Sequence, residues 1–329
     1  LREAGIPYAV VMVPWPVGRS LDKVLDSMAE TVGIAQRYDA HLVEINLPGY
    51  TRHFSERELF DLEKVWSSVV ARVRELRESH HTPIVAMPAM YEENLCEPVK
   101  NLPSVIGLVR NSPAERAGVR KGDVIVKIEG IKIISRPQAR DLLSLAKERG
   151  GEQVNITLKR GEEEVVVPVD MGRHAYPYSP YIDHHLGIIF LGTGLRLSYI
   201  EALKNLIDQR GAKRVLFLSS ELVKPIFRQL LSESPLLTGS GISMDIEVPA
   251  NSLLGGNIFM GDLLTVQDFI DAIEDHLDRA ESRPDLVVIP SSPFNLGAWS
   301  RDLTGRSYLE IERAVGVPVA LLRCTTIYD

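Results

Sequence analysis

The spacing of apolar and polar positions divides the chain into stretches of different periodicity. In residues 1–91, short apolar runs such as Tyr8–Val13 alternate with stretches whose apolar residues recur every three or four positions. A continuous apolar run is typical of a strand buried on both faces, so this stretch predicts a βαβαβ unit with parallel strands. Ser55 and Glu58 have the spacing of a capping box and predict the start of the second helix.

Strands outnumber helices between residues 96 and 171, where turns at Glu129-Gly130 and Arg160-Gly161 separate apolar runs. The βα alternation resumes after a Tyr- and Pro-rich linker, with a first strand expected at 186–191 and helices expected to begin at Ser198, Thr265 and Ser307. The predicted fold class is α/β, with parallel βα units on both sides of the β-rich module. The predicted domains are a partial barrel-like unit (1–95), the module (96–171), the linker (172–182) and a Rossmann-like α/β domain (183–329).

The most specific pattern is the run from Ser112 to Gly130, which begins Ser-Pro-Ala-Glu-Arg-Ala-Gly and continues through Gly122-Asp123. Ser112 is placed to cap a short helix that has Pro113 at its first position and Gly118 at its end. The run resembles a bacterial PDZ domain of the type found in high-temperature-requirement proteases, and the resemblance covers about residues 100 to 170.

A PDZ domain implies binding by strand addition, in which a protein C-terminus lies in a groove between a strand and a helix. The resemblance places this groove between the strand 105–109 and the helix after Ser135. The predicted peptide-binding residues are Val105, Ile106, Gly107, Leu108 and Leu142. The segment 97–103, expected to bind the carboxylate, contains two prolines that lack donors. The alternative is a PDZ domain that packs on its neighbours as a spacer or lid.

A second resemblance covers about residues 186 to 323 and rests on the run Asn251–Asp268, on Leu286–Pro290 and on Arg301–Thr304. These segments are similar to an uncharacterised domain that ends PDZ-containing, iron–sulfur oxidoreductase-like proteins of the radical S-adenosylmethionine (SAM) superfamily. Members of that group usually have the PDZ domain first, whereas here an α/β part precedes it. The resemblance implies a radical SAM-like oxidoreductase whose PDZ and terminal domains dock a substrate or partner.

The cysteines restrict that interpretation, because the chain has only Cys96 and Cys324 and a 4Fe–4S cluster needs more thiolates than two. We therefore expect no cofactor in this chain. A 4Fe–4S cluster and S-adenosylmethionine would belong to a longer native protein, for which residues 1–91 would supply the second half of a barrel. The start at Leu1 rather than at methionine favours that hypothesis. The alternative function is a non-enzymatic PDZ scaffold that binds protein C-termini.

Polar and glycine residues gather after the predicted strands of the C-terminal part, where open α/β sheets bind ligands. The predicted ligand-binding residues are Asn251, Gly255, Gly256, Asn257, Asp262, Ser291 and Ser292. Loops of this composition also form ordinary turns, and Asp262 and Asp302 are either acid/base groups or caps of their own loops. Adjacent histidines, as in His80-His81, rarely supply two ligands to one metal, so no metal site is predicted.

Composition excludes several classes of function. The net charge of −7 argues against a nucleic-acid-binding face, and no apolar run reaches the 18 or so residues that a membrane span needs. Two cysteines among 329 residues fit a reducing cytoplasm, so the predicted location is cytoplasmic. A protein C-terminus is the predicted partner.

The scarcity of thiolates generates a first prediction. The purified chain should contain no stoichiometric iron or acid-labile sulfide after anaerobic reconstitution, because it lacks the ligands. Colorimetric iron and sulfide assays measure this directly, and a cluster bound in stoichiometric amount would contradict it.

Overall fold

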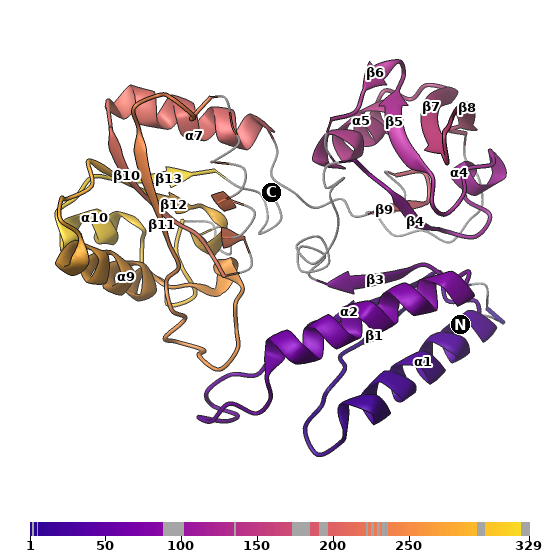
Figure 1. The fold of residues 1–329 in the computed structure, drawn as a ribbon, viewed down its shortest axis with the longest axis horizontal. Coiled ribbons are helices and arrows are strands. Elements are labelled where there is room, and N and C mark those ends of the chain that lie inside the picture. Colours follow the sequence, from indigo (N-terminus) through magenta and orange to yellow (C-terminus); the bar gives the residue numbers. More distant parts are fainter. Residues whose placement is uncertain are drawn as a thin grey trace. The chain divides into compact units, whose positions relative to one another are not determined.

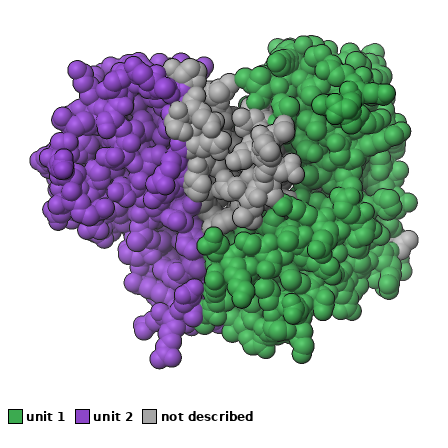
Figure 2. Space-filling model, viewed as in Figure 1, with its two compact units in different colours: residues 1–48, 59–194 green, residues 49–58, 195–329 purple. Residues whose placement is uncertain are grey.

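The computed structural model describes residues 1–329 except 2, 5, 88–101, 135, 173–184, 191–196, 222, 225–226, 229–230, 232–233, 235, 295–299 and 324–329. The chain falls into two compact units (Figure 2). Unit 1 consists of Leu1–Pro48 and Leu59–Gly194, and unit 2 consists of Gly49–Glu58 and Leu195–Asp329. The chain is a mixed α/β protein, and each unit has its own sheets (Figure 1).

Unit 1 begins with a three-stranded parallel sheet in the order β1-β2-β3. Its strands are β1 (Ala9–Met12), β2 (Leu42–Asn46) and β3 (Ile84–Met87). The helices α1 (Leu21–Arg37) and α2 (Leu62–Ser79) connect them, capped by the side chains of Ser20 and Asp61. Apolar residues from both helices and from β2 and β3 form the core, among them Val32, Val43, Trp66, Val73 and Ile84.

The predicted start of the second helix at Ser55 is wrong. The Asp61 carboxylate accepts a hydrogen bond from the Lys64 amide at 3.0 Å, so the helix begins after Asp61. Ser55 instead closes a local turn, in which its hydroxyl oxygen accepts from the Arg57 amide at 3.2 Å. Ser55 and Glu58 have the spacing of a capping box, but both lie in the segment 49–58, which packs in unit 2 and forms no helix there.

The β-rich module of unit 1 contains a four-stranded antiparallel sheet in the order β6-β5-β7-β8. The strands are β5 (Val124–Ile128), β6 (Ile131–Lys132), β7 (Gln153–Arg160) and β8 (Glu163–Asp170). A second, two-stranded antiparallel sheet joins β4 (Val105–Leu108) to β9 (Ile188–Phe190). The helices are α4 (Pro113–Arg116) and α5 (Arg136–Glu148). One apolar cluster fills the module and includes residues of β4, β5, β7, β8, β9 and α5.

The position of β9 differs from the sequence-based boundary at residue 183. The sequence placed this strand first in the C-terminal domain, whereas its pairing with β4 puts it in unit 1. Leu186, Ile188 and Phe190 are all buried in the apolar cluster of the β-rich module. An apolar run carries no mark of the sheet that it joins, so periodicity alone could not assign this strand.

Unit 2 has a four-stranded parallel sheet in the order β11-β10-β12-β13. Its strands are β10 (Arg214–Leu218), β11 (Ser243–Glu247), β12 (Leu286–Pro290) and β13 (Val319–Leu322). Its helices are α7 (Leu197–Arg210), α9 (Val266–Arg279) and α10 (Leu309–Val315), with short 3₁₀ turns η1 (Gly261–Leu263) and η2 (Ser292–Phe294). In Figure 1, α7 covers one face of the sheet, and α9 and α10 lie on the other.

The predicted helix starts in unit 2 are confirmed in part. Thr265 and Asp268 form the capping box predicted at α9, so that start is confirmed. At α10 the Glu310 carboxylate accepts from the Ser307 amide at 3.1 Å, but the helix itself begins at Leu309. The half-barrel and Rossmann-like assignments remain predictions.

Two glycines of unit 1 provide a matched test of its packing. A Cβ at Gly107 in β4 would lie 2.9 Å from Pro83 Cβ and 3.1 Å from Pro83 Cα, whereas a Cβ at Gly33 in α1 would meet nothing within 4 Å. We expect Gly107→Ala to destabilise unit 1 by about 1–3 kcal/mol through overpacking. Gly33→Ala should stabilise it by about 0.5–1 kcal/mol, because glycine is costly inside a helix. Denaturant unfolding measures both, and equal effects of the same sign would contradict this packing.

Candidate functional site

The Ser112–Gly130 run builds one corner of the β-rich module. Ser112 caps α4 by accepting from the Glu115 amide at 3.3 Å, and Gly118 follows the helix with φ +93°. Asp123 is buried and receives two hydrogen bonds from Arg160, at 2.8 Å to Oδ1 and 2.7 Å to Oδ2. The hydrogen bond to Asp123 raises the pKa of Arg160. This paired contact ties the start of β5 to the end of β7.

A tight turn precedes β9 and packs on this corner. Leu186 and Gly187 both have positive φ, +59° and +81°. A Cβ at Gly187 would lie 2.1 Å from Ser112 Cβ, so only glycine fits there. The Gly187 carbonyl accepts from the Val109 amide at 2.8 Å, and the Leu186 carbonyl accepts from the Ala114 amide at 3.2 Å. The turn is therefore fixed between β4 and α4.

The five predicted peptide-binding residues lie in different surroundings. Val105 is buried in the apolar cluster, and Leu108 and Leu142 are partly buried against the same cluster. Ile106 packs against the buried pair Val109 and Ile189, as do Leu42 and Val85 of the parallel sheet, and Gly107 lies against Pro83. The strand that carries four of them, β4, pairs along its length with β9. Within the described residues, β9 has β4 as its single strand neighbour.

Comparison with known proteins agrees with this geometry. Residues 105–160 match the PDZ domain family, so the predicted PDZ domain is confirmed. A 65-residue stretch, 20% of this chain, is 31% identical to a probable CtpA-like serine protease of Staphylococcus haemolyticus and spans 13% of that protein. A crystal structure of a PDZ domain protein from Parabacteroides distasonis is 17% identical. It covers 42% of this chain and 33% of its own, with a TM-score of 0.18, too low to support a structural conclusion.

The second candidate region lies at the carboxyl ends of the unit 2 strands. The chain runs from β10 outward to β11 and returns to β12 on the other side of β10, so the strand order reverses between β10 and β12. Ligands of open α/β sheets bind at such a reversal. The residues that directly follow these two strands are buried: Ser219, Ser220, Ser291 and Ser292.

A cavity of about 440 Å³ opens at the ends of β10 and β11, and Ser291 and Ser292 after β12 do not line it. The residues that line it include Ser220, Lys224, Asn251, Gly255, Gly256 and Met260. Asn251 is the organising residue, because its Nδ2 donates to the Leu263 carbonyl at 3.0 Å and its Oδ1 accepts from the Leu254 amide at 2.9 Å. The cavity thus brings together three of the predicted ligand-binding residues.

The glycines of this region have a contact that sequence reasoning missed. Residues 251–258, the glycine loop, bind the main chain of residues 50–52. The Asn257 Oδ1 accepts from the Tyr50 amide at 2.6 Å, and the Asn257 amide donates to the Tyr50 carbonyl at 3.1 Å. These predicted ligand-binding residues therefore hold a segment about 200 positions earlier in the chain. Binding of a separate ligand by the predicted set remains a prediction.

Asp262 and Asp302 differ in their surroundings. Burial raises the pKa of the Asp262 carboxyl, against a hydrogen bond from its own amide, and within the described residues its Oδ1 has no partner. Gly261 next to it lies close to Ser220, whose buried Oγ likewise has no partner among the described residues. The acid/base and capping interpretations of Asp262 both remain predictions.

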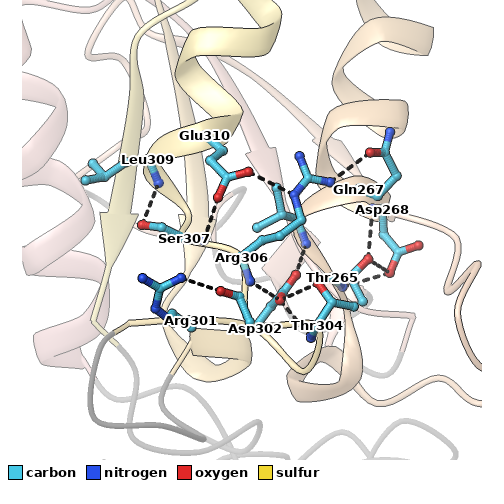
Figure 3. A network of polar contacts seen from close by, with 12 residues as sticks. Thr265, Gln267, Asp268, Arg301, Asp302, Thr304, Arg306, Ser307, Leu309 and Glu310 are labelled. Carbon is cyan, nitrogen blue, oxygen red and sulfur yellow. Dashed lines mark hydrogen bonds and ion pairs between the residues drawn. The ribbon is translucent and has the colours of Figure 1, made fainter.

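Asp302 has the capping role (Figure 3). Its Oδ2 accepts from the Val266 amide at 2.6 Å, and its Oδ1 accepts from the amides of Thr304 and Arg306 at 2.8 and 2.9 Å and from the Thr304 hydroxyl at 2.7 Å. Burial would raise the pKa of Asp302, but these hydrogen bonds outweigh it and lower the pKa. The carboxylate fixes the loop to the first turn of α9.

No group of three or more His, Cys, Asp or Glu residues is placed to hold a metal ion within the described ranges. The side chain of His80 lies with Nδ1 3.0 Å from the Leu76 carbonyl at the end of α2. Cys96 and Cys324, the residues on which the cluster argument depends, lie outside the described residues. Among the described helices, none is both long and apolar enough to cross a bilayer.

The capping role of Asp302 predicts a pH-dependent loss of stability. A lowered pKa in the folded state adds stability above the unfolded pKa of about 4, and that stability disappears as the pH falls through the folded value. Asp302→Asn should lower the stability of unit 2 by about 1–3 kcal/mol at pH 7, and less at pH 3. Differential scanning calorimetry measures both values.

Asp278→Asn on the exposed side of α9 is the control, because Asp278 is exposed on the same helix. It should leave the transition within about 0.5 kcal/mol of the parent chain at either pH. An Asp302→Asn deficit that stays constant from pH 7 to pH 3 would contradict the account of this carboxylate.

Proposed function

We propose that this chain is a docking protein whose PDZ domain binds the C-terminus of a protein partner by strand addition along β9. The observation that carries the proposal is the pairing of β9 with β4, a strand of the stretch 105–160 that matches the PDZ domain family. An added strand needs an edge, and β9 has one strand neighbour among the described residues.

The geometry around β9 supports this choice of strand over β4. β4 already pairs with β9, and around it Ile106 and Gly107 pack on the parallel sheet of unit 1. The turn before β9 has two successive positive φ values, and its Ile188 amide donates to the His185 carbonyl at 3.0 Å, so a terminal carboxylate would meet the amides of Leu186 and Gly187. The carboxylate would then bind at the turn Leu186-Gly187, not at the proline-containing segment 97–103.

Helix α5 supplies the other wall of the proposed groove. Its buried residues Ala139 and Leu143 share one apolar cluster with Ile188 and Phe190 of β9. Leu142, which follows on the neighbouring face of α5, is partly buried against that cluster. The proposed peptide contacts are therefore Leu142 on α5 and the strand β9, in place of the four β4 residues predicted from the sequence.

The spacer interpretation has some support, because β4 packs on the parallel sheet inside unit 1. That packing uses Val109 and Ile189 and the partly buried Leu42, Val85 and Ile106. None of these residues belongs to α5, so this packing and docking at the Leu142 face of α5 are compatible. The matched relative is a probable protease, but this chain spans 13% of it, and the proposed function is docking without proteolysis.

Radical SAM chemistry is a separate hypothesis that the matched family and relative do not support. Its test is the native reading frame, in which a Cys-x-x-x-Cys-x-x-Cys loop upstream of Leu1 would favour it. A docking role for the PDZ domain holds with or without that loop. A cytoplasmic location likewise remains a prediction.

Two leucines of α5 test the docking role. Peptides selected from a library of free C-terminal heptapeptides should bind the full chain, and their amidated forms should bind at least tenfold more weakly. Leu142→Glu should weaken binding at least tenfold, about 1.4 kcal/mol, because it places a carboxylate in the groove. Fluorescence anisotropy with a labelled peptide measures these affinities.

The matched control is Leu145→Glu, one position of the same helix that is 40% exposed. It should change the affinity less than twofold. Failure to select any peptide, equal binding of amidated peptides, or equal effects of the two substitutions would each contradict the proposed function.

A further inference from the structure

Residues 49–58, here called the strap, leave unit 1 after Pro48 and return to it at Leu59. In between they pack as part of unit 2. The strap lies between β2 and α2 in sequence, so the contact joins positions about 200 residues apart. A connection between neighbouring elements is normally short, and one that packs in another unit calls for a physical reason.

The strap is held by its main chain. The Tyr50 amide donates to Asn257 Oδ1 at 2.6 Å, the Tyr50 carbonyl accepts from the Asn257 amide at 3.1 Å, and the Arg52 amide donates to the Leu254 carbonyl at 2.7 Å. Tyr50 is 7% exposed. Three main-chain hydrogen bonds along three residues resemble the way in which an extended peptide is bound.

The glycine loop is shaped for this contact. Gly256 has φ +64°, and a Cβ there would lie 2.1 Å from the Tyr50 carbonyl oxygen. Gly255 has φ +58°, and a Cβ there would lie 3.0 Å from Arg52 Cβ. Two successive residues thus lack a side chain where the strap approaches. The close approach accounts for these glycines without an anionic ligand.

The same loop also forms a wall of the 440 Å³ cavity at the ends of β10 and β11. Gly255, Gly256 and Ile258 line the cavity, and Ile258 Cδ1 lies 3.5 Å from the position of a Cβ on Gly49. Asn251, on the cavity side, fixes the loop through the Leu254 amide. Leu254 in turn accepts the hydrogen bond from Arg52.

We infer that the glycine loop is an interaction surface for extended main chain, that the strap is its partner, and that strap binding and the cavity wall are energetically coupled. A change on the cavity side therefore alters strap binding, and release of the strap loosens the cavity wall. Such coupling is reciprocal by thermodynamic necessity.

Amide hydrogen exchange of the full chain, read by mass spectrometry or NMR, tests the contact. The Tyr50 and Arg52 amides should exchange at least tenfold more slowly than those of an exposed loop. Gly256→Ala should speed exchange of both amides at least tenfold. Gly241→Ala is the matched control, because Gly241 has φ +72° but nothing within 4 Å of an added Cβ. It should change their exchange less than twofold.

Two further substitutions keep the test decisive if Gly256→Ala misfolds. Asn257→Ala removes the acceptor of the Tyr50 amide and should speed its exchange at least tenfold. Asn251→Ala, at a residue with no hydrogen bond to the strap within the described ranges, should speed exchange of the Arg52 amide at least threefold through the Leu254 link. Fast exchange of both strap amides in the parent chain would overturn the inference, and so would an Arg52 amide that Asn251→Ala leaves unchanged.

Discussion

The antiparallel pairing of β9 with β4 is the contact that brings a distant segment of the chain into the apolar cluster of the β-rich module. It inserts Leu186, Ile188 and Phe190 into the apolar cluster, and each such side chain contributes about 1.5–3 kcal/mol when it is buried. The pairing closes a loop of about 80 residues. The free-energy cost of closing a loop grows slowly, by about 0.6 kcal/mol for each doubling of the loop length. Burial of the three side chains offsets this cost.

The same pairing decides which strand can accept a partner. Once β9 lies along β4, β4 has a strand neighbour, while its side chains pack in the cluster and on the parallel sheet of unit 1. Gly187 is restricted at the same point by Ser112, which links the turn before β9 to the cap of α4. The Ser112–Gly130 run therefore also positions the turn before β9, although the two are far apart in sequence.

The sequence predicted those elements whose signals are local. The capping box Thr265–Asp268, the cap at Ser112 and the PDZ run around Gly122-Asp123 depend on neighbouring residues, and the structure has them in place. Sequence-based prediction of a helix start or of a strand's sheet failed where contacts with a distant segment determine it. The Ser55 box was outweighed by docking of residues 49–58 in unit 2, and the apolar run at 188–190 joined a sheet that its own periodicity cannot specify.

The glycine loop shows the same limit at the level of a site. Gly255, Gly256 and Asn257 have the composition of a loop that binds an anion, and main-chain binding needs the same small residues and amides. Only the position of Tyr50 distinguishes the two, and that position is set by tertiary contacts. Asp302 was correctly described by one of its two open interpretations, because its neighbours Thr304 and Arg306 are local in sequence.

The most direct test of the account is a titration of the isotope-labelled full chain with a free C-terminal peptide, followed by backbone amide chemical shifts. The account predicts that the largest changes fall on residues 187–190 and on the Leu142 face of α5, with new protection of β9 amides from exchange. Changes centred on residues 105–108, with β9 unaffected, would contradict it.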